Sequence, residues 1–193
     1  KFNKIKLKDA LKHPNWNMGK KITIDSATMM NKVFEVIEAR NIFNLSYDKI
    51  SILTHPKSYV HAIIKFKDGL TKLLVHEPDM RIPIFNSLYL FSRRNFKTNS
   101  LDLKILNNLN LKKVDLAKFP VVNLLKILPN YPSLFETVLI TVNDNLVLKF
   151  LKKQIDFKKL INLINKISNL KEFAKYKKIK PKNISDIYRL RAY

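Results

Sequence analysis

The sequence contains no cysteine, and only two of its 193 residues, Gly19 and Gly69, are glycine. Without cysteine the chain forms no disulfide bond and performs no thiol chemistry, and nothing argues for an oxidising compartment. Two isolated glycines cannot supply the glycine-rich phosphate turn of a dinucleotide-binding βαβ domain. A nucleophile turn of the Gly-x-Ser-x-Gly type is also absent, which removes support for acyl transfer. The sequence therefore predicts no nucleotide-binding domain within this chain.

Long apolar runs and acidic residues are also scarce. Charges interrupt every apolar stretch before it reaches the length of a membrane span, and the first residues lack the apolar core of a secretory signal. We therefore expect no membrane association, and a location in the cytoplasm or the plastid stroma.

Lysine and arginine number 37 against 15 acidic residues, a formal charge of +22. The lysines are scattered through every segment, which favours a solvated basic surface and no nucleic-acid partner. A basic nucleic-acid-binding protein is the alternative, favoured by charge alone.

The most informative pattern lies between residues 23 and 38. Apolar residues recur there at i, i+3, i+4 and i+7, at positions Met30, Val33, Phe34 and Ile37. This spacing predicts an amphipathic helix over residues 27–43 with a buried apolar stripe. The stripe is preceded by three typical helix-start residues, Asp25, Ser26 and Thr28. We expect their side-chain oxygens to accept hydrogen bonds from free backbone N–H groups.

Three polar side chains fall beside the stripe and can converge on one ligand: Asn31, Lys32 and Glu35. A helix start with an adjacent lysine favours an anion such as phosphate. Glu35 would repel that anion unless a cation lay between them, so the pattern suggests phosphate with Mg²⁺ or Mn²⁺ nearby. A capped surface helix with a Lys/Glu pair explains the same spacing about equally well.

Three further runs complete a family pattern. They read His-Pro-Asn-Trp-Asn-Met-Gly at 13–19, His-Pro-Lys-Ser-Tyr-Val-His at 55–61 and Pro-Asp-Met-Arg-Ile-Pro-Ile at 78–84. With the helix, and in this order, they resemble the 1-deoxy-D-xylulose 5-phosphate reductoisomerases. The resemblance implies an NADPH-dependent enzyme of the non-mevalonate isoprenoid pathway, which uses Mg²⁺ or Mn²⁺ to convert 1-deoxy-D-xylulose 5-phosphate into 2-C-methyl-D-erythritol 4-phosphate.

The resemblance also implies a role for particular residues. The contacts to the substrate phosphate correspond to His13, Ser26, Asn31 and Lys32. Glu35 corresponds to a carboxylate that touches both substrate and metal, and the catalytic residues are Glu35, Lys32 and His13. The rest of the substrate pocket corresponds to Trp16, Met18, His61 and Met80, of which the first two belong to a flap over the sugar. Gly19 corresponds to a position that contacts the nicotinamide cofactor.

The resemblance further implies what accompanies this chain. In the family an NADPH-binding domain and two more acidic metal ligands precede the region that the chain resembles. Because the chain opens on lysine rather than methionine, we expect it to be the catalytic and C-terminal portion of a longer polypeptide. The resemblance implies that this polypeptide forms a homodimer. We also expect this portion to be inactive without the upstream NADPH-binding domain.

Two departures from the family pattern favour a rival hypothesis. The family has glycine directly after the Asn-Lys pair, where this chain has Val33. The family's Asn-Ala-Ala-Asn-Glu run corresponds here to Ile-Thr-Val-Asn-Asp at 140–144, in which the small residues are enlarged. The rival is a non-catalytic remnant of the enzyme, retained as a dimerisation or structural domain.

The chain pattern predicts an α+β catalytic domain with a small mixed or antiparallel sheet, followed by a C-terminal α-helical bundle. The expected organisation is a catalytic domain over 1–92, a connector over 93–115 and a helical domain over 116–193. Asp68 and Gly69 predict a two-residue hairpin turn between strands at 61–67 and 70–76. The other expected elements are a strand at 49–55 and helices at 83–91, 120–128, 133–152, 156–168 and 184–192.

Overall fold

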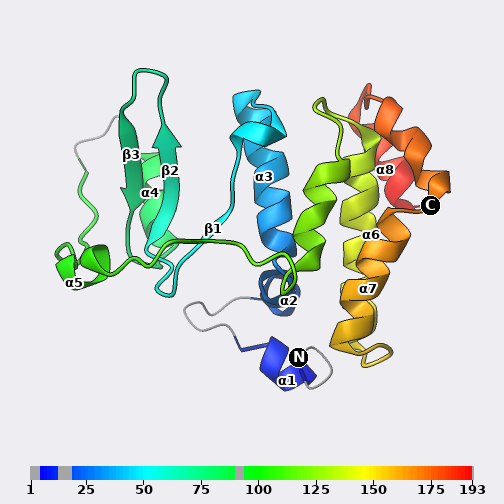
Figure 1. Ribbon diagram of the computed structural model, residues 1–193, viewed down its shortest axis with the longest axis horizontal. Coiled ribbons are helices and arrows are strands. Elements are labelled where there is room, and N and C mark those ends of the chain that lie inside the picture. Colours follow the sequence, from blue (N-terminus) through cyan, green and yellow to red (C-terminus); the bar gives the residue numbers. More distant parts are fainter. Residues whose placement is uncertain (1–4, 13–18, 90–93, 193) are drawn as a thin grey trace. The chain divides into compact units, whose positions relative to one another are not determined.

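The structure is a computed structural model that describes residues 5–12, 19–89 and 94–192. It divides into two compact units, one formed by residues 1–52 together with 114–193 and the other by residues 53–113 (Figure 1). These units differ from the expected boundaries at residues 92 and 116. The reason is that the helix at 30–43 packs against the C-terminal helical elements, so that both ends of the chain share one core.

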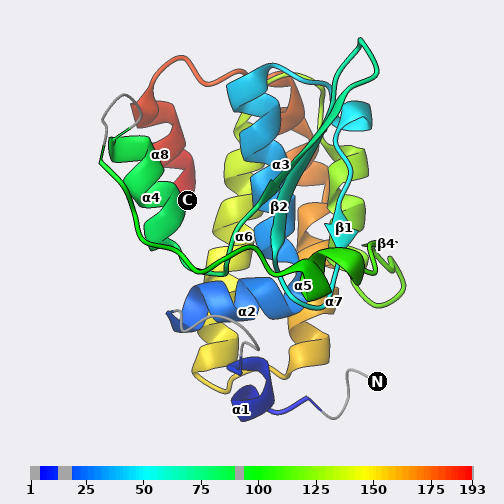
Figure 2. The ribbon, with the colours of Figure 1, turned by 90° about the vertical axis from the view of Figure 1, so that its left-hand side faces the viewer.

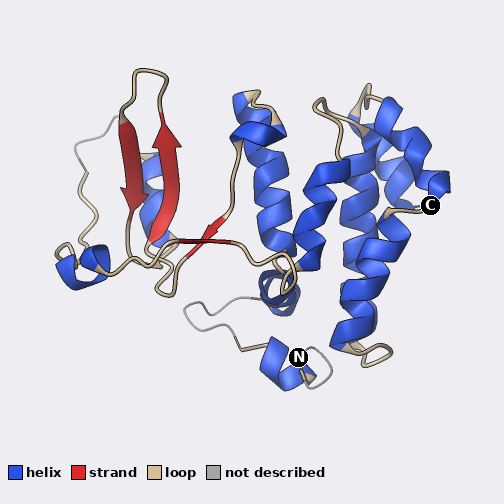
Figure 3. Ribbon diagram, viewed as in Figure 1, coloured by secondary structure: helices blue, strands red, loops and turns tan. Residues whose placement is uncertain are grey.

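The first unit is helical (Figure 3). Its elements are α1 (Leu7–Ala10), α2 (Lys20–Thr28), α3 (Met30–Phe43), η2 (Tyr47–Lys49), η3 (Pro120–Ile127), α6 (Leu134–Leu151), α7 (Phe157–Ser168), η4 (Lys171–Lys178) and α8 (Ile184–Ala192). The three predicted C-terminal helices are confirmed as α6, α7 and α8, within one residue at each end. The expected helix at 120–128 forms 3₁₀ turns instead of an α-helix.

The hydrophobic core of the first unit is shared by α2, α3, η3, α6 and α7. The predicted stripe of α3 contributes Met30, Val33 and Ile37, all buried, while Phe34 packs on the edge of the core. Helix α2 is seen end-on in Figure 1 and from its side in Figure 2, whereas α3 is seen from its side in both, so the two helices cross steeply. This crossing places the end of α2 beside the first turn of α3.

A polar cluster joins the end of α3 to the start of α6. The Arg40 side chain is buried and donates to the backbone carbonyl of Asn130 and to Asn41. Asn41 and the Tyr47 hydroxyl donate to the two carboxylate oxygens of Glu136, each at 3.4 Å. Burial raises the pKa of the Glu136 carboxyl, and this outweighs the two hydrogen bonds and the positive charge of Arg40, which act in the opposite direction.

This raised pKa predicts a pH-dependent effect of Glu136→Gln. The folded state binds a proton at Glu136 more tightly than the unfolded chain, so the carboxyl's stabilising contribution is present at low pH and is lost as pH rises through the folded pKa. We expect the glutamine variant to gain free energy of unfolding relative to the parent as pH rises above about 4.5. Urea denaturation over a pH series measures this, with Glu172→Gln, an exposed acid, as the control. The prediction would be contradicted if the free energy of unfolding of the variant did not increase relative to that of the parent as pH rises.

The second unit holds short antiparallel strands. Its elements are β1 (Leu53–Thr54), β2 (Val60–Lys65), β3 (Thr71–Val75), α4 (Arg81–Leu88), α5 (Leu103–Asn107) and β4 (Lys112–Lys113). Strand β1 pairs with β4, and β2 pairs with β3. The predicted hairpin is confirmed, but three residues separate the paired residues Phe66 and Leu70, and Gly69 has φ 92°. The expected strand at 49–55 is much shorter, because residues 47–49 form a 3₁₀ turn.

The second unit leaves most of its apolar side chains in solvent. Among its described residues, Tyr59 is the one buried hydrophobic side chain. Both strands of the hairpin carry exposed aliphatic residues, namely Ile63, Ile64, Leu73 and Leu74. A two-stranded hairpin is marginally stable without a surface to pack on. Across both units, none of the described helices has the length and apolar character that a membrane crossing requires.

Candidate phosphate and metal site

The predicted site lies at the corner where α2 meets α3. The chain turns there at Met29, which has a left-handed backbone with φ 67°, a conformation uncommon for a residue other than glycine. The buried Thr28 hydroxyl donates to the carbonyls of Ile24 and Asp25, each at 3.1 Å, and accepts from the Met30 N–H at 3.4 Å. The corner is therefore held by one side chain that bonds the end of α2 and the start of α3.

The helix-start roles expected for Asp25 and Ser26 are wrong, because both residues lie inside α2 rather than before α3. The Ser26 hydroxyl donates to the Ile22 carbonyl at 2.9 Å, one turn back along its own helix. The Asp25 carboxylate is buried and pairs with other side chains. Thr28 alone keeps the expected role, through its contact with Met30. A single helix over 27–43 could not accommodate the left-handed residue at position 29.

Asn31, Lys32 and Glu35 lie together on the first turns of α3, as their spacing predicts. Lys32 Nζ is 2.7 Å from Glu35 Oε2, and Asn31 Nδ2 donates to Glu35 Oε1 at 3.3 Å. The Lys32 and Glu35 side chains are 41% and 51% exposed, so the cluster is open to a ligand from solvent. Asn31 Oδ1 is buried and has no hydrogen-bond partner among the described residues. Such an unpartnered amide oxygen is costly, and a bound ligand or ion would relieve that cost.

The described residues offer one carboxylate of a metal site. Glu35 is a hard oxygen ligand of the kind that Mg²⁺ and Mn²⁺ prefer. Among the described residues, however, no group of three or more histidine or acidic side chains could hold a metal ion. A cation at Glu35 would take the place of the Lys32 ammonium and would need further ligands. Glu35 therefore fits one position of such a site and does not complete it.

Gly19 directly precedes α2. Its φ of −58° is open to any residue, and a Cβ atom added at this position would meet no described atom within 4 Å. Its carbonyl accepts from the Thr23 hydroxyl at 2.9 Å, at the first turn of α2. Neither backbone strain nor packing within the described residues thus requires glycine at position 19.

The other predicted site residues either belong to the second unit or lie outside the described residues. His61, on β2, and Met80, directly before α4, belong to the second unit, and each is described within that unit alone. The His61 ring stacks on the His76 ring with centroids 3.5 Å apart, and Met80 is 55% exposed. His13, Trp16 and Met18 lie outside the described residues.

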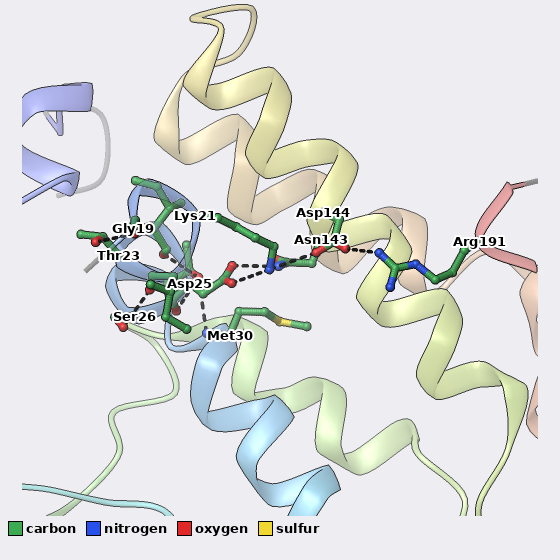
Figure 4. Close-up of polar contacts among 12 residues, drawn as sticks. Gly19, Lys21, Thr23, Asp25, Ser26, Met30, Asn143, Asp144 and Arg191 are labelled. Atoms are coloured by element: carbon green, nitrogen blue, oxygen red, sulfur yellow. Dashed lines mark hydrogen bonds and ion pairs between the residues drawn. The ribbon is translucent and has the colours of Figure 1, made fainter. Parts of the chain in front are cut away.

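A polar network that the sequence did not reveal links α2 to α6 beside the corner (Figure 4). Asn143 is fully buried on α6 and donates to Asp25 Oδ1 at 2.8 Å. Lys21 Nζ lies 2.7 Å from Asp25 and 3.0 Å from Asp144, and Arg191 lies 2.9 Å from Asp144. Burial lowers the pKa of Lys21, but its contacts with Asp25 and Asp144 outweigh that effect and raise the pKa above its usual value. The one sequence signal was the asparagine and acid retained in the run 140–144.

Two protein-family models match parts of the chain. Residues 1–43 match a model of the 1-deoxy-D-xylulose 5-phosphate reductoisomerase C-terminal domain, and residues 75–192 match a model of the DXP reductoisomerase C-terminal domain. The chain is 58% identical over its whole length to 1-deoxy-D-xylulose 5-phosphate reductoisomerase of Pelagibacter ubique, covering 50% of that protein. It is 38% identical to the enzyme of a Sulfurihydrogenibium species, over 97% of the chain and 48% of that protein.

Solved structures give the same result. One is a crystal structure of DOX-P reductoisomerase in complex with NADPH, fosmidomycin and magnesium. The match covers 99% of this chain and 48% of the chain in that structure, with 31% identity and a TM-score of 0.89. Another is 1-deoxy-D-xylulose 5-phosphate reductoisomerase from Zymomonas mobilis in complex with NADPH. That match covers 99% of this chain and 48% of the chain in that structure, with 29% identity and a TM-score of 0.80. An α+β region followed by a helical bundle is thus the fold of this family's C-terminal half. The chain belongs to the 1-deoxy-D-xylulose 5-phosphate reductoisomerase family, and it spans about half the length of the relatives it matches.

Proposed function

We propose that this chain is the part of a 1-deoxy-D-xylulose 5-phosphate reductoisomerase that binds the substrate phosphate and supplies one metal ligand. The observation that carries the proposal is the open cluster of Asn31, Lys32 and Glu35 at the α2–α3 corner, in a chain that belongs to this family. The whole enzyme would contain this chain and a further segment, which corresponds to the half of its relatives that the chain does not match. That segment would supply the NADPH-binding domain and the remaining metal ligands.

The phosphate site would use Ser26, Asn31 and Lys32, with His13. Lys32 supplies the positive charge, and its ammonium now rests on Glu35. The Ser26 hydroxyl now donates to the Ile22 carbonyl, so it must exchange that bond to donate to phosphate. Binding the phosphate end of the sugar in this way orients the reacting carbons, which is how contacts remote from the reaction contribute to the rate.

Glu35 would hold Mg²⁺ or Mn²⁺ together with acidic ligands from the rest of the enzyme. When bound, such an ion supplies Lewis-acid polarisation and a template for the substrate oxygens. Lys32, which pairs with Glu35 in the structure, would then bind the phosphate instead. Gly19 would lie against the nicotinamide cofactor, and the freedom around it leaves room for a close approach.

The residues that complete the pocket would be Trp16, Met18, His61 and Met80. The exposed side chain of Met80 is available to a substrate or to another part of the enzyme. We also propose that the whole enzyme is a homodimer, supported by the aliphatic residues that the β2–β3 hairpin leaves in solvent. Exposed apolar surface on a small sheet commonly marks a surface that another protein covers.

The experiment that tests the proposal is Lys32→Ala in the whole enzyme. We expect the variant to bind the sugar phosphate about 10–100-fold more weakly, because a charge-assisted contact is worth about 1.5–3 kcal/mol. Binding of dephosphorylated 1-deoxy-D-xylulose should change little. Calorimetry with both ligands measures the difference. The control is Lys49→Ala, which removes an exposed lysine beyond the far end of α3. Equal losses for the two ligands would show that Lys32 does not bind the phosphate.

A further inference from the structure

We propose that Asp25, Asn143 and Asp144 are positioning residues for the phosphate site at the α2–α3 corner. The proposal deepens the proposed function and rests on it. None of these three residues is itself predicted to contact the phosphate. Instead they tie the corner to α6, the long central helix of the first unit, through side chains that lie beside the corner (Figure 4). They therefore act on Ser26, Asn31 and Lys32 through the backbone.

One continuous hydrogen-bonded path runs from α6 to the first residue of α3. Asn143 donates to the Asp25 carboxylate at 2.8 Å, across 118 residues of sequence. The Asp25 backbone carbonyl accepts from the Thr28 hydroxyl at 3.1 Å, and the same hydroxyl accepts from the Met30 N–H at 3.4 Å. Ser26 follows Asp25 in the chain and Asn31 follows Met30, so two residues of the path are peptide-bonded to residues of the predicted phosphate site.

A second path reaches α3 through Lys21. Its ammonium bonds Asp25 and Asp144 and also lies 5.7 Å from the centroid of the Phe34 ring. Phe34 directly precedes Glu35 on α3. A cation over an aromatic face is attracted to it, so the ammonium holds α2, α3 and α6 together at one point.

The composition of the network explains why it favours one geometry. It contains two cations, Lys21 and Arg191, and two anions, Asp25 and Asp144, so its formal charges balance. The Asp25 side chain is only 2% exposed, and burying a carboxylate is costly unless it is paired and hydrogen-bonded. A displacement of α2 relative to α6 would separate that carboxylate from Asn143 and would separate Lys21 from Asp144. The α2–α3 corner is thereby preorganised before substrate arrives.

The test is Asp25→Asn in the whole enzyme, which keeps the shape of the side chain and removes its charge. We expect affinity for 1-deoxy-D-xylulose 5-phosphate to fall about tenfold or more, as is typical for residues that orient a ligand-binding group. Affinity for dephosphorylated 1-deoxy-D-xylulose should fall less than about twofold, because that ligand has no phosphate to contact Ser26, Asn31 and Lys32. Asp144→Asn, at a partly exposed position, should likewise lower the affinity for the phosphorylated ligand more than the affinity for the dephosphorylated one.

Rescue and a matched control separate positioning from general stability. Combining Asp25→Asn with Asn143→Asp reverses the hydrogen bond while keeping the net charge, and we expect it to restore a large part of the affinity. The control is Val147→Ala, which leaves a cavity one turn further along α6 at a fully buried position outside the network. It should lower the melting temperature without discriminating between the two ligands.

Three results would overturn the inference: equal losses for both ligands in Asp25→Asn, no loss for either, or the same discrimination in Val147→Ala. The Lys32→Ala experiment keeps the two proposals apart. If Lys32→Ala discriminates between the ligands and Asp25→Asn does not, the positioning role is wrong and the phosphate site stands. If Lys32→Ala does not discriminate, the proposed phosphate site itself is wrong.

Discussion

Glu35→Gln in the whole enzyme should reduce turnover at least about a thousandfold at ordinary metal concentration. A metal acting as Lewis acid contributes several kcal/mol, and each 1.4 kcal/mol corresponds to about a factor of ten in rate. Glutamine keeps the volume of the side chain but removes the charge that holds the cation. Excess Mn²⁺ should therefore restore part of the activity. Steady-state NADPH oxidation with saturating substrate measures the loss.

The fold should tolerate this change. Glu35 is 51% exposed, and its ion pair with Lys32 lies at the surface, where such pairs contribute at most about 1 kcal/mol. Glutamine is nearly as good a helix former as glutamate. The melting temperature should therefore shift little, which separates loss of the metal ligand from loss of the fold.

Glu38→Gln is the matched control, because it makes the same substitution at an exposed position one turn further along α3. It should leave turnover unchanged. Near-normal activity of Glu35→Gln without added metal would mean that Glu35 is only a surface partner of Lys32. The proposed metal role would then be wrong, while the phosphate role of Lys32 would remain open to its own test.

Periodicity and turn chemistry predicted the local elements of this fold well. Helix α7 carries a strong amphipathic pattern, α6 is rich in apolar residues, and both begin within one residue of the predicted positions. The Asp68-Gly69 pair predicted the β2–β3 hairpin, and Gly69 does adopt the positive φ that favours glycine. These features depend on neighbours in the sequence, which is why the sequence alone shows them.

Features that depend on distant partners were missed. The corner at Met29 is one, since nothing in the local pattern separates α2 from α3 there. Aspartate is a typical capping residue, yet Asp25 is bonded by Asn143 on α6, and its burial follows from that long-range contact. The pairing of β1 with β4 likewise joins residues far apart in the sequence. Local propensity cannot report such contacts, because tertiary packing overrides it.

Val33 bears directly on the rival hypothesis of a non-catalytic remnant. The resemblance implies glycine at this position, and a larger residue there suggested crowding of the site. In the structure the Val33 side chain is fully buried and belongs to the core formed with α6 and α7. It lies on the buried stripe of α3, whereas Lys32 and Glu35 remain half exposed. The valine therefore contributes to the core, and its presence does not argue against a functional site.

Restoring the glycine should accordingly destabilise this protein. Val33→Gly removes a buried side chain worth about 1.5–3 kcal/mol and adds a cost of about 1 kcal/mol for glycine within a helix, a total loss of about 2.5–4 kcal/mol in the free energy of unfolding. Val33→Ala keeps the helix former and should lose about 2 kcal/mol. Urea denaturation followed by circular dichroism measures both. Turnover per folded molecule of the whole enzyme should not rise in either variant. A glycine variant as stable as its parent, or one with higher turnover, would show that Val33 crowds the site instead of supporting the core.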